Sequence, residues 1–582
     1  MERGEDLPER QSVLDAVERA VRECPERSAI ETEGERICYL DFRLEFRDFA
    51  TRLEALTAPG EFIGIMANRT AASIIAMVGA LAAGRPFVFI DPRDNESSNR
   101  LKVSSLGLRA IAGDPSSPRT PVLAEIPAEW RAETRGHRVS PGGDLTARHG
   151  RIGYAIHTSG STGEPKCVLV RADPLAPMIR DHVRRLDLSP RSRTLQFARL
   201  TFDGCITEIL WTLAAGACLV IPRQERVSPG PMLQETLEDL QVTHLKTTPF
   251  ALTVTQPTRA MSLEHVINGG GACRPSVVRK WSSVTAFHNA YGTTETTVCN
   301  FLSGRLDPSD CAESVPLGDL VGDCGYQIVP LPPDAREDLT DPRASRGELV
   351  ITGESVAVGY LTTDGVQLFT DGLASRTYRT GDIVEHRDGR VFFVDRLDRQ
   401  LKVRGYRLDP GEIEAAACRL PGVMDAVVVA ESHEDGPGAE DPADALVCYY
   451  QGDMAPRQLR SHLDAVIDPY KVPSLIQQVE RLPYTKNGKV DREALRTVRS
   501  SSAAAFPVGS PEEQVLHLVR RLTGVSDAGL DENFFNIGGD SASTLVLVSK
   551  LKELGWMDAG VRDVLRAESL QDLISELRTR IA

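Results

Sequence analysis

The chain lacks most features that would place it outside the ordinary soluble proteins. Its eleven cysteines include no CxxC pair and their number is odd, which argues against a disulfide framework or a zinc site and favours a reducing cytosol. Its longest apolar run, residues 71–84, is too short to span a bilayer and predicts a buried helix. The charged N-terminus has no apolar core, so no signal peptide is expected. The sequence therefore predicts a cytoplasmic protein.

The chain also lacks an excess of basic residues. Its 67 lysines and arginines face 82 aspartates and glutamates, and the formal net charge is -15. Nucleic acids and anionic membranes need a basic face, so neither is expected as a partner. Any phosphate that the protein binds must be held locally. A length of 582 residues exceeds what one hydrophobic core organises, which predicts two to four domains.

From about residue 60, short apolar β-branched runs alternate with helical patterns. This alternation predicts an α/β domain with parallel-type sheets covered by helices, and such sheets place ligands at the carboxyl ends of their strands. Three unusual segments follow apolar runs directly, namely "HTSGSTGEPK" (157–166), "NGGGA" (268–272) and "YGTTETT" (291–297). We therefore expect these three segments to meet at one binding site.

The pattern changes in the last third of the chain. From about residue 395 to 495 it predicts a smaller α+β domain, and residues 497–511 have the small, polar, proline-containing composition of a flexible linker. The tail from residue 511 to 582 contains helical patterns and has a net charge of -4. These features predict a small, acidic, all-α bundle at the C-terminus.

The segment 157–166 has the composition of a phosphate-binding loop. Gly160 and Gly163 allow backbone amides to approach an anion closely, the serine and threonine hydroxyls add donors, and Lys166 adds a positive charge. The Walker spacing GxxxxGK[ST] is absent. Without further motifs, a mobile surface loop would be an equally ordinary explanation of these residues.

The glycine-rich segment is the first of six motifs that occur in order and at compatible distances: "IHTSGSTGEPK", "YGTTETT", "GELVITGESVAVGYL", "YRTGD", "RLDRQLKVRGYRLDPGEIE" and "NGKVDRE". Together they resemble the core motifs of the adenylate-forming superfamily and, more narrowly, the amino-acid adenylation domains of nonribosomal peptide synthetases. The tail "DENFFNIGGDSAS" resembles the attachment site of a peptidyl carrier (thiolation) domain. The resemblance covers nearly the whole chain. It departs from the family pattern at Cys167, Thr293 and Asp395, none of which replaces a catalytic group.

The resemblance implies a domain organisation. Residues 1–396 would form the large N-terminal adenylation subdomain, and residues 397–498 the small C-terminal subdomain, with a hinge near Asp398. Residues 499–510 would be the linker, and residues 511–582 a four-helix carrier bundle. The chain leaves no room for a condensation or thioesterase domain, so a free-standing adenylation–carrier didomain is expected.

The resemblance also implies an ATP-dependent, AMP-forming ligase. ATP with Mg²⁺ would convert an amino acid to an aminoacyl-adenylate, and the thiol of a 4'-phosphopantetheine arm would then take the acyl group as a thioester. The implied partners are a phosphopantetheinyl transferase and a downstream tailoring, condensation or transfer enzyme. Some such domains need a small MbtH-like activator protein, and the sequence leaves open whether this one does.

The family's functional residues can be carried over one by one. Tyr291 would lie against adenine, Thr294 would meet the α-phosphate, and Glu295 would bind Mg²⁺. Asp382 would accept the ribose hydroxyls, and Arg396 would assist at the ribose or phosphate. The remaining positions matched to ATP binding are Thr158, Ser159, Gly160, Ser161, Thr162, Gly163, Lys166 and Gly271.

Two lysines and a serine are expected to carry the chemistry. Lys489 matches the lysine that bridges substrate carboxylate and α-phosphate, and Lys402 matches the lysine that faces the site after the small domain rotates about Asp398. Ser541 matches the phosphopantetheine attachment site. Outside this context, a solvated side chain would be the ordinary explanation of each lysine, and a helix N-cap that of Ser541.

The pocket positions of the family indicate an α-amino acid. Asp203 matches the aspartate that pairs with the substrate α-ammonium, although a turn aspartate is an ordinary alternative. Lys246 follows an apolar run, and a buried ammonium needs a counter-charge, which a side-chain carboxylate of the substrate could supply. The expected substrate is therefore L-aspartate, asparagine or a β-substituted relative. The other pocket positions are Gly204, Thr207, Ile267, Gly269, Ala290, Val298 and Cys299, with Lys489 as the last.

Two other functions stay open at this stage. An acyl or aryl acid ligase with a fused carrier would have a neutral residue in place of Asp203. A catalytically silent carrier scaffold would not need the intact Lys166, Glu295, Asp382 and Lys489. The family pattern at these positions therefore favours amino-acid activation.

Overall fold

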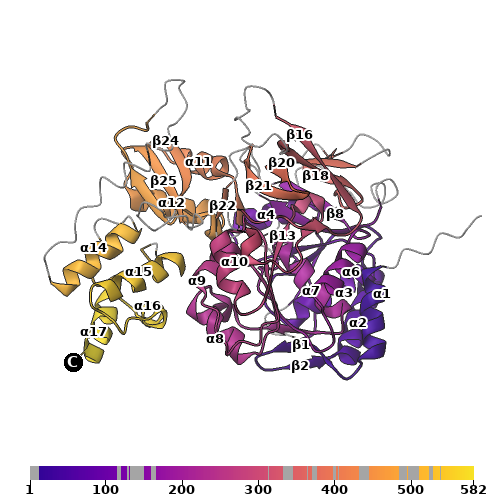
Figure 1. Cartoon of the computed structure of the whole chain (residues 1–582). Helices are drawn as coiled ribbons and strands as arrows, with labels where there is room; N and C mark the ends of the chain where they lie inside the picture. Colours follow the sequence, from indigo (N-terminus) through magenta and orange to yellow (C-terminus); the bar gives the residue numbers. More distant parts are fainter. Residues whose placement is uncertain are drawn as a thin grey trace, which may run out of the picture. The chain divides into compact units, whose positions relative to one another are not determined.

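The computed structural model describes residues 12–113, 119–127, 130, 150–158, 166–311, 314–331, 345–362, 365–369, 376–397, 401–403, 406–431, 445–483, 495, 510–523, 528–537, 539 and 541–581. The chain divides into two compact units (Figure 1). The larger unit lies within Met1–Asp398, and the smaller unit contains Arg399–Ala582.

Two mixed sheets form the centre of the larger unit. Their strand orders are β15-β14-β13-β12-β11-β9-β10-β1-β2 and β19-β18-β8-β7-β4-β3-β5-β6. The strands of the first sheet are β1 (Ser28–Thr32), β2 (Arg36–Cys38), β9 (Arg193–Leu195), β10 (Cys218–Ile221), β11 (His244–Thr247), β12 (His265–Asn268), β13 (Ala286–Tyr291), β14 (Phe301–Leu302) and β15 (Asp319–Leu320). Those of the second are β3 (Ile63–Met66), β4 (Phe87–Ile90), β5 (Ala110–Ala112), β6 (Leu123–Glu125), β7 (Ile152–Thr158), β8 (Lys166–Arg171), β18 (Gly359–Thr362) and β19 (Gly365–Leu368).

Both sheets are parallel at the centre and antiparallel at the edges. Strands β1 and β9 to β13 pair in parallel, as do β3, β4, β5 and β7. Strands β2, β14 and β15 in the first sheet, and β6, β8, β18 and β19 in the second, pair antiparallel. The expected α/β fold is confirmed. At one edge, β1 and β2 are joined by the short described segment 33–35 and pair directly as antiparallel strands.

A third sheet of the larger unit was not predicted from the alternation of strands and helices. Its four strands pair antiparallel in the order β16-β17-β20-β21. Their bounds are β16 (Cys324–Pro330), β17 (Ser345–Gly353), β20 (Thr377–Arg387) and β21 (Arg390–Arg396). No helix is described between these strands, so they form a meander rather than βαβ units.

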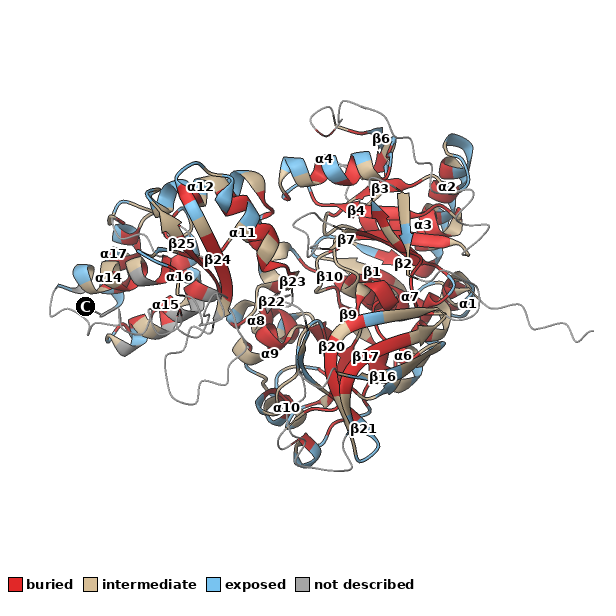
Figure 2. Cartoon of the chain, turned by 90° about the horizontal axis from the view of Figure 1, so that it is seen from above, coloured by how far each residue is buried: buried red, intermediate tan, exposed pale blue. Residues whose placement is uncertain are grey.

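Helices cover the two large sheets, and the main hydrophobic core lies between the sheets. Apolar residues of both sheets join those of α1, α2, α3 and α7 in one buried cluster, and Figure 2 shows buried residues concentrated in the central strands. The helices of this unit are α1 (Val13–Glu23), α2 (Tyr39–Leu56), α3 (Ala71–Ala82), α4 (Glu96–Ser105), α6 (Leu175–Arg185), α7 (Gly204–Ala214), α8 (Pro231–Asp239), α9 (Pro249–Val254) and α10 (Pro275–Ser282), with 3-10 turns η2 (Gln224–Val227), η3 (Thr294–Thr296) and η4 (Pro308–Cys311).

Helix α3 is the helix predicted from the apolar run at residues 71–84. Residues 71–81 are all buried, and the Thr70 hydroxyl caps the helix by accepting from the amide of Ser73. The prediction of a buried helix is confirmed. Among the described residues, no helix combines the length and the apolar character needed to cross a membrane.

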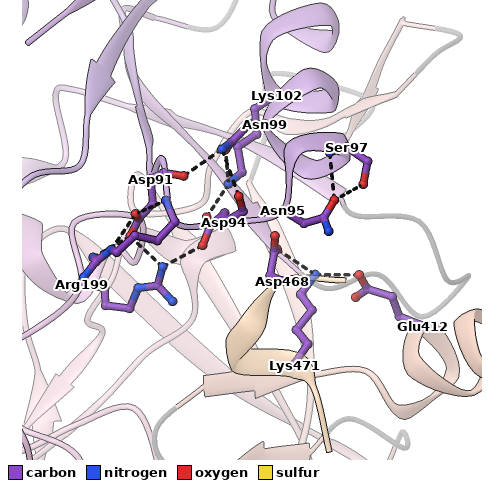
Figure 3. Close-up of polar contacts among 11 residues, drawn as sticks. Asp91, Asp94, Asn95, Ser97, Asn99, Lys102, Arg199, Glu412, Asp468 and Lys471 are labelled. Atoms are coloured by element: carbon purple, nitrogen blue, oxygen red, sulfur yellow. Dashed lines mark hydrogen bonds and ion pairs between the residues drawn. The ribbon is translucent and has the colours of Figure 1, made fainter. Parts of the chain in front are cut away.

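A buried ionic network ties the loop after β9 to the loop after β4 (Figure 3). The guanidinium of Arg199 donates to Asp91 and Asp94, both at 2.7 Å. Arg93 also binds Asp91, and Lys102 of α4 donates to Asp94 at 2.8 Å. Burial alone would raise the pKa of Asp91, but the hydrogen bonds from Arg93 and the charge of Arg199 lower it to about 2. The network therefore connects the two large sheets through ion pairs.

Three imidazoles stack across the parallel strands β11, β12 and β13, near the amino ends of β11 and β12. The ring centroids of His244 and His265 lie 4.9 Å apart, and those of His265 and His288 lie 5.2 Å apart. Burial, with smaller contributions from the neighbouring rings, lowers the pKa of each to about 4. The nearby charges of Asp187 and Arg305 act on His265 in opposite directions. The three rings are therefore neutral at physiological pH.

The smaller unit contains an α+β part and a helical bundle. Its strands are β22 (Leu401–Val403), β23 (Tyr406–Leu408), β24 (Val423–Glu431), β25 (Ala445–Gly452) and β26 (Leu475–Gln478), and its helices are α11 (Pro410–Cys418), α12 (Pro456–Val466), η6 (Pro469–Lys471), α14 (Pro511–Thr523), α15 (Ser541–Glu553), α16 (Val561–Arg566) and α17 (Leu570–Ile581). Lys471 of η6 donates to Glu412 of α11 at 2.6 Å and lies 3.6 Å from Asp468 (Figure 3). Helices α14 to α17 enclose a separate core, as expected for a carrier bundle.

The substitution Arg199→Met should lower the free energy of unfolding by about 2–3 kcal/mol. The expected loss is smaller than for a buried carboxylate left without any cation, because Arg93 still pairs with Asp91 and Lys102 with Asp94. Chemical denaturation followed by fluorescence measures it. The control Arg184→Met removes an exposed ion pair with Asp181 and should cost less than about 1 kcal/mol. Equal losses in both variants would contradict a stabilising role of the network.

The stacked histidines should make stability depend on pH. Because folding lowers their pKa values to about 4, the unfolded chain binds more protons than the folded one between pH 6.5 and 4. The free energy of unfolding should therefore fall as the pH drops through this window. Replacing one ring, in His265→Asn, should reduce the slope by up to about 1.4 kcal/mol per pH unit. Urea denaturation at a series of pH values tests this, and identical slopes would show that the rings do not titrate as described.

Candidate functional site

The carboxyl ends of three parallel strands bring predicted pocket residues together. Lys246 on β11 pairs in register with Ile267 on β12, and Ala290 lies near the end of β13. The strand ends are fastened by a hydrogen bond of 2.9 Å from Asn268 Nδ2 to Asn289 Oδ1. Since parallel strands end at the same edge of a sheet, these positions form one wall of a site.

Lys246 is a buried cation with neutral partners. Its Nζ donates to Thr207 Oγ1 at 2.6 Å and lies 3.5 Å from the carbonyl oxygen of Gly204. Its Nζ also lies 5.9 Å from the ring centroid of Trp211. A Cβ atom added to Gly269 would lie 3.3 Å from Lys246 Cε. Among the described residues, no carboxylate lies within ion-pair distance of this ammonium, although only 9% of the residue is exposed.

Four of the remaining predicted pocket positions are buried and neutral. Ile267, Ala290, Val298 and Cys299 all belong to the core cluster between the two sheets. Burial raises the pKa of the Cys299 thiol to about 12, so this side chain stays neutral.

Asp203 occupies the position that precedes helix α7. Its side chain makes no capping hydrogen bond to the helix, and the residue is half-buried. A capping aspartate would normally accept from an amide of the first turn. Its position one residue before Gly204 places it beside the contacts of Lys246 with Gly204 and Thr207.

Glu208 fixes the segment that leads to Asp203, and it was not predicted from the sequence. Its carboxylate accepts from the amides of Phe197 at 3.1 Å and Ala198 at 3.2 Å. Arg69 donates to the carbonyls of Gln196 and Phe197 in the same segment. Burial raises the pKa of Glu208 to about 7, against the opposing effect of the Lys246 charge. Together with Arg199, these groups hold residues 196–199 in place.

The phosphate side of the predicted site is described in part. Thr158 and Lys166 face each other across the antiparallel strands β7 and β8, and residues 159–163 lie outside the described residues. The buried carboxylate of Glu295 accepts a hydrogen bond of 2.8 Å from the hydroxyl of Tyr360. The Nζ of Lys166 lies 5.0 Å from the centroid of the same Tyr360 ring. One tyrosine thus contacts both the expected phosphate lysine and the expected magnesium ligand.

The turn that carries Glu295 is strained and closely packed. Thr294 begins the 3-10 turn η3, and Thr297 and Val298, which follow it, have φ of 61° and 65°. Positive φ is costly for β-branched residues, so the surrounding contacts must hold the turn. One such contact is a hydrogen bond of 2.6 Å from Thr297 Oγ1 to the carbonyl of Ser355. A Cβ atom on Gly292 would lie 2.2 Å from Val298 O, so this turn requires glycine there.

The ribose side brings together three residues that the sequence placed far apart. The hydroxyl of Tyr291 donates to Asp382 Oδ2, and Arg396 donates to Asp382 Oδ1. Burial and the charge of Asp382 raise the pKa of Tyr291 well above its ordinary value, so the phenol remains a donor. The carbonyl of Gly271 accepts from Asn268 Nδ2 at 3.3 Å at the adjacent strand end. The Asp382 carboxylate, which Tyr291 and Arg396 hold in place, has further lone pairs that can accept from hydroxyl groups.

Several predicted residues cannot be placed. Asp398 and Lys489 lie outside the described residues. Only the backbone of Lys402 is described, on β22 opposite Arg407 of β23. Only the backbone of Ser541 is described, as the first residue of helix α15. The roles of these four residues therefore stay predictions.

The approach to helix α15 explains part of the motif before Ser541. A Cβ atom on Gly539 would lie 2.4 Å from two ring carbons of Phe534. The chain can therefore pass over this ring only with glycine at that position. Phe534 itself belongs to the core of the bundle. The packing thus places the start of α15 directly beside the core.

Three functional contacts were missed from the sequence. Tyr360 lies within the quoted motif at residues 347–361, but no role was assigned to it. Glu208 and Arg199 flank Asp203 in the chain, and only their contacts with distant segments reveal what they hold. Position within or next to a recognised motif was the only signal available for all three.

Comparison with known proteins defines three matched regions. The sequence profile of the AMP-binding enzyme family matches residues 17–361, and that of the AMP-binding enzyme C-terminal domain matches residues 412–489. The profile of the phosphopantetheine attachment site matches residues 513–577. These matches confirm the resemblance inferred from the motifs.

Among curated proteins, the chain is similar to bacitracin synthase 3 of Bacillus licheniformis, with 29% identity over 98% of the chain and 9% of that protein. It is 27% identical to tyrocidine synthase 2 of Brevibacillus parabrevis over 94% of the chain and 15% of that protein. It is 30% identical to novobiocin biosynthesis protein H of Streptomyces niveus over 92% of the chain and 91% of that protein. The chain therefore spans only a small part of the large synthetases.

Solved structures share the fold. Holo-PA1221, an NRPS protein containing adenylation and PCP domains, gives a TM-score of 0.75 at 24% identity, covering 99% of this chain and 98% of that one. The Vibrio cholerae adenylation domain AlmE, in complex with glycyl-adenosine-5'-phosphate, gives a TM-score of 0.72 at 19% identity, covering 86% and 100%. The profile matches to residues 17–361 and 513–577 show that the chain belongs to the AMP-binding enzyme family and continues into a phosphopantetheine attachment domain.

Proposed function

We propose that this protein is an ATP-dependent, AMP-forming ligase that activates an amino acid and loads it onto its own carrier domain. The observation that carries the proposal is the arrangement of two half-sites in one unit. Lys166 and Glu295 contact a common tyrosine on one side, and Asp382, Tyr291 and Arg396 form a hydrogen-bonded cluster on the other.

Each half-site suits one part of Mg·ATP. Glu295 supplies the hard oxygen ligand that Mg²⁺ prefers, and Lys166 supplies a positive charge for the β- and γ-phosphates. Asp382 can accept from both ribose hydroxyls while Tyr291 and Arg396 hold it in place. Lys489 would stabilise the charge that develops on the α-phosphate during attack by the substrate carboxylate.

The second half-reaction would use the carrier bundle. The phosphopantetheine arm on Ser541 supplies a mobile thiol that accepts the aminoacyl group. Lys402 would face the site after the small domain rotates near Asp398. This role requires a phosphopantetheinyl transferase to attach the arm and a downstream tailoring, condensation or transfer enzyme to receive the product. An MbtH-like activator protein is a further candidate partner.

The substrate that suits the pocket is L-aspartate, asparagine or a β-substituted relative. The Lys246 ammonium is buried and has only neutral partners among the described residues, so a substrate carboxylate or amide oxygen would complete its coordination. Because burial raises the pKa of Glu208 to about 7, this neighbouring acid is not fully ionised at neutral pH. The pocket thus retains positive charge that a side-chain carboxylate would balance.

The two alternative functions fit the site less well. An aryl or fatty acid offers no α-ammonium to Asp203 and no side-chain carboxylate or amide oxygen to Lys246, whose partners among the described residues are neutral. A silent scaffold has no need for the contacts that hold Glu295 and Asp382 in place. ATP–pyrophosphate exchange with amino acids and their des-amino analogues separates the three functions.

Lys246→Met should lower kcat/KM for L-aspartate in ATP–pyrophosphate exchange by at least about 30-fold, because the charge-assisted contact is worth roughly 2 kcal/mol. The loss for asparagine should be smaller. The control Lys102→Met removes another buried lysine of the same unit, whose partner is Asp94, and should leave the ratio of aspartate to asparagine activity unchanged. Exchange of the wild type only with large aromatic acids would rule out this substrate class.

Ser541→Ala should abolish attachment of the phosphopantetheine arm and leave ATP–pyrophosphate exchange intact, because adenylation takes place in the other domain. Mass spectrometry after treatment with a phosphopantetheinyl transferase and CoA measures attachment, and addition of ATP and L-aspartate then tests loading. The control Ser543→Ala, a buried serine two residues later on the same helix, should still be modified. Modification of the Ser541→Ala protein would show that the arm is elsewhere. A modified wild type that never gains an acyl group would favour the scaffold.

A further inference from the structure

Tyr360 lies on strand β18, which joins the two parts of the phosphate site. Strand β18 pairs antiparallel with β8, the strand that begins with Lys166, and Tyr360 is opposite Val168. The segment just before it is fastened to the turn of Glu295, because the amide of Ala357 donates to the carbonyl of Glu295 at 2.9 Å. Tyr360 is therefore fixed to both elements through the backbone before its side chain makes any contact.

The hydroxyl of Tyr360 holds the Glu295 carboxylate. It donates to Glu295 Oε1 at 2.8 Å, and its oxygen lies 3.1 Å from the hydroxyl of Tyr378. Since Tyr378 can donate in turn, the two phenols form a short chain that ends on the carboxylate. A phenol keeps its proton throughout the physiological range, so this hydroxyl acts as the donor. A hydrogen bond to one oxygen orients the carboxylate toward a metal ion.

The ring of Tyr360 supports Lys166. The ammonium lies 5.0 Å from the ring centroid, within the range of a cation–π contact. The ring itself is held edge-on against Phe369, with centroids 4.7 Å apart and an interplanar angle of 87°. Phe369 in turn packs against Tyr378 at 4.9 Å. The aromatic cluster thus fixes the orientation of both the ring face and the hydroxyl.

We propose that Tyr360 is a positioning residue that sets the geometry between Lys166 and Glu295 and thereby preorganises the site for Mg·ATP. This inference rests on the proposed roles of Lys166 at the phosphates and Glu295 at Mg²⁺. The two functions of the side chain are separable, because the hydroxyl acts on Glu295 and the ring acts on Lys166. Supporting contacts around a metal ligand contribute to the affinity of the metal site without touching the metal.

The test compares Tyr360→Phe with Tyr360→Leu in the full-length protein. Phenylalanine keeps the ring and removes the hydroxyl. It should raise the MgCl2 concentration for half-maximal ATP–pyrophosphate exchange about tenfold, while KM for ATP at saturating Mg²⁺ changes less than about twofold. Leucine removes both contacts and should also raise KM for ATP about 3- to 30-fold. KM for the amino acid should stay within about twofold in both variants, because the acid pocket lies elsewhere.

The control is Tyr378→Phe, which removes the hydroxyl that contacts Tyr360 and keeps the Tyr360 side chain, and it should shift the Mg²⁺ curve less than about threefold. A Tyr360→Phe enzyme with the wild-type Mg²⁺ curve overturns the inference, as does an equal shift in the control. Thermal melting of each variant identifies any loss that comes from unfolding.

Calorimetric titration with ATP, with and without MgCl2, separates this inference from the proposed function. A wild type that binds Mg·ATP but exchanges no pyrophosphate with any amino acid contradicts the proposed function alone. In that case, the increase in ATP affinity on adding MgCl2 still tests the inference. A smaller increase in Tyr360→Phe than in the wild type supports it, and an equal increase overturns it. A wild type that binds no Mg·ATP overturns both.

Discussion

The parallel pairing of β11, β12 and β13 is the constraint on which the site depends. Parallel strands run in one direction, so their carboxyl ends and the segments that follow them must meet at one edge. Lys246, Ile267 and Ala290, all predicted pocket positions, lie near this edge for this reason, although the chain separates them by more than twenty residues at each step. The hydrogen bond between Asn268 and Asn289 closes the same edge. A change of register here would move every pocket position at once.

The larger unit keeps an unusual number of charged groups away from water, and each is matched in its own way. Asp91 and Asp94 are neutralised by arginine and lysine, whereas Glu208 accepts backbone amides and has its pKa raised. Among the described residues, Lys246 donates to a hydroxyl, lies near a carbonyl and an indole ring, and makes no ion pair. Burying an ion costs several kcal/mol unless partners compensate. Lys246 differs in this respect from the ionic groups that hold the fold, which is consistent with its predicted place in the acid pocket.

The sequence predicted what depends on local pattern and failed where distant segments meet. The apolar run at residues 71–84 predicted a buried helix, and the alternation of strands and helices predicted the α/β class. It did not predict the antiparallel sheet at residues 324–396, because these strands follow one another without the helical patterns that mark βαβ units. Arg199 and Tyr360 were missed because their partners are far away in the chain, and no periodicity records such contacts. The roles of Lys489 and Asp398 stay predictions, since both lie outside the described residues.

The link between Arg199 and the loop after β4 also limits how enzymes of this family can be recombined. Apart from Lys489, the predicted pocket residues lie between positions 203 and 299, which makes that stretch an obvious block to exchange between relatives with different substrates. A graft that begins a few residues earlier would bring a foreign side chain to position 199 while Asp91 and Asp94 remain from the host. Asp91 and Asp94 would then lose one of the cations that neutralise them inside the protein. Junctions placed after position 199, or accompanied by transfer of residues 91–102, would keep the cation and its carboxylates together.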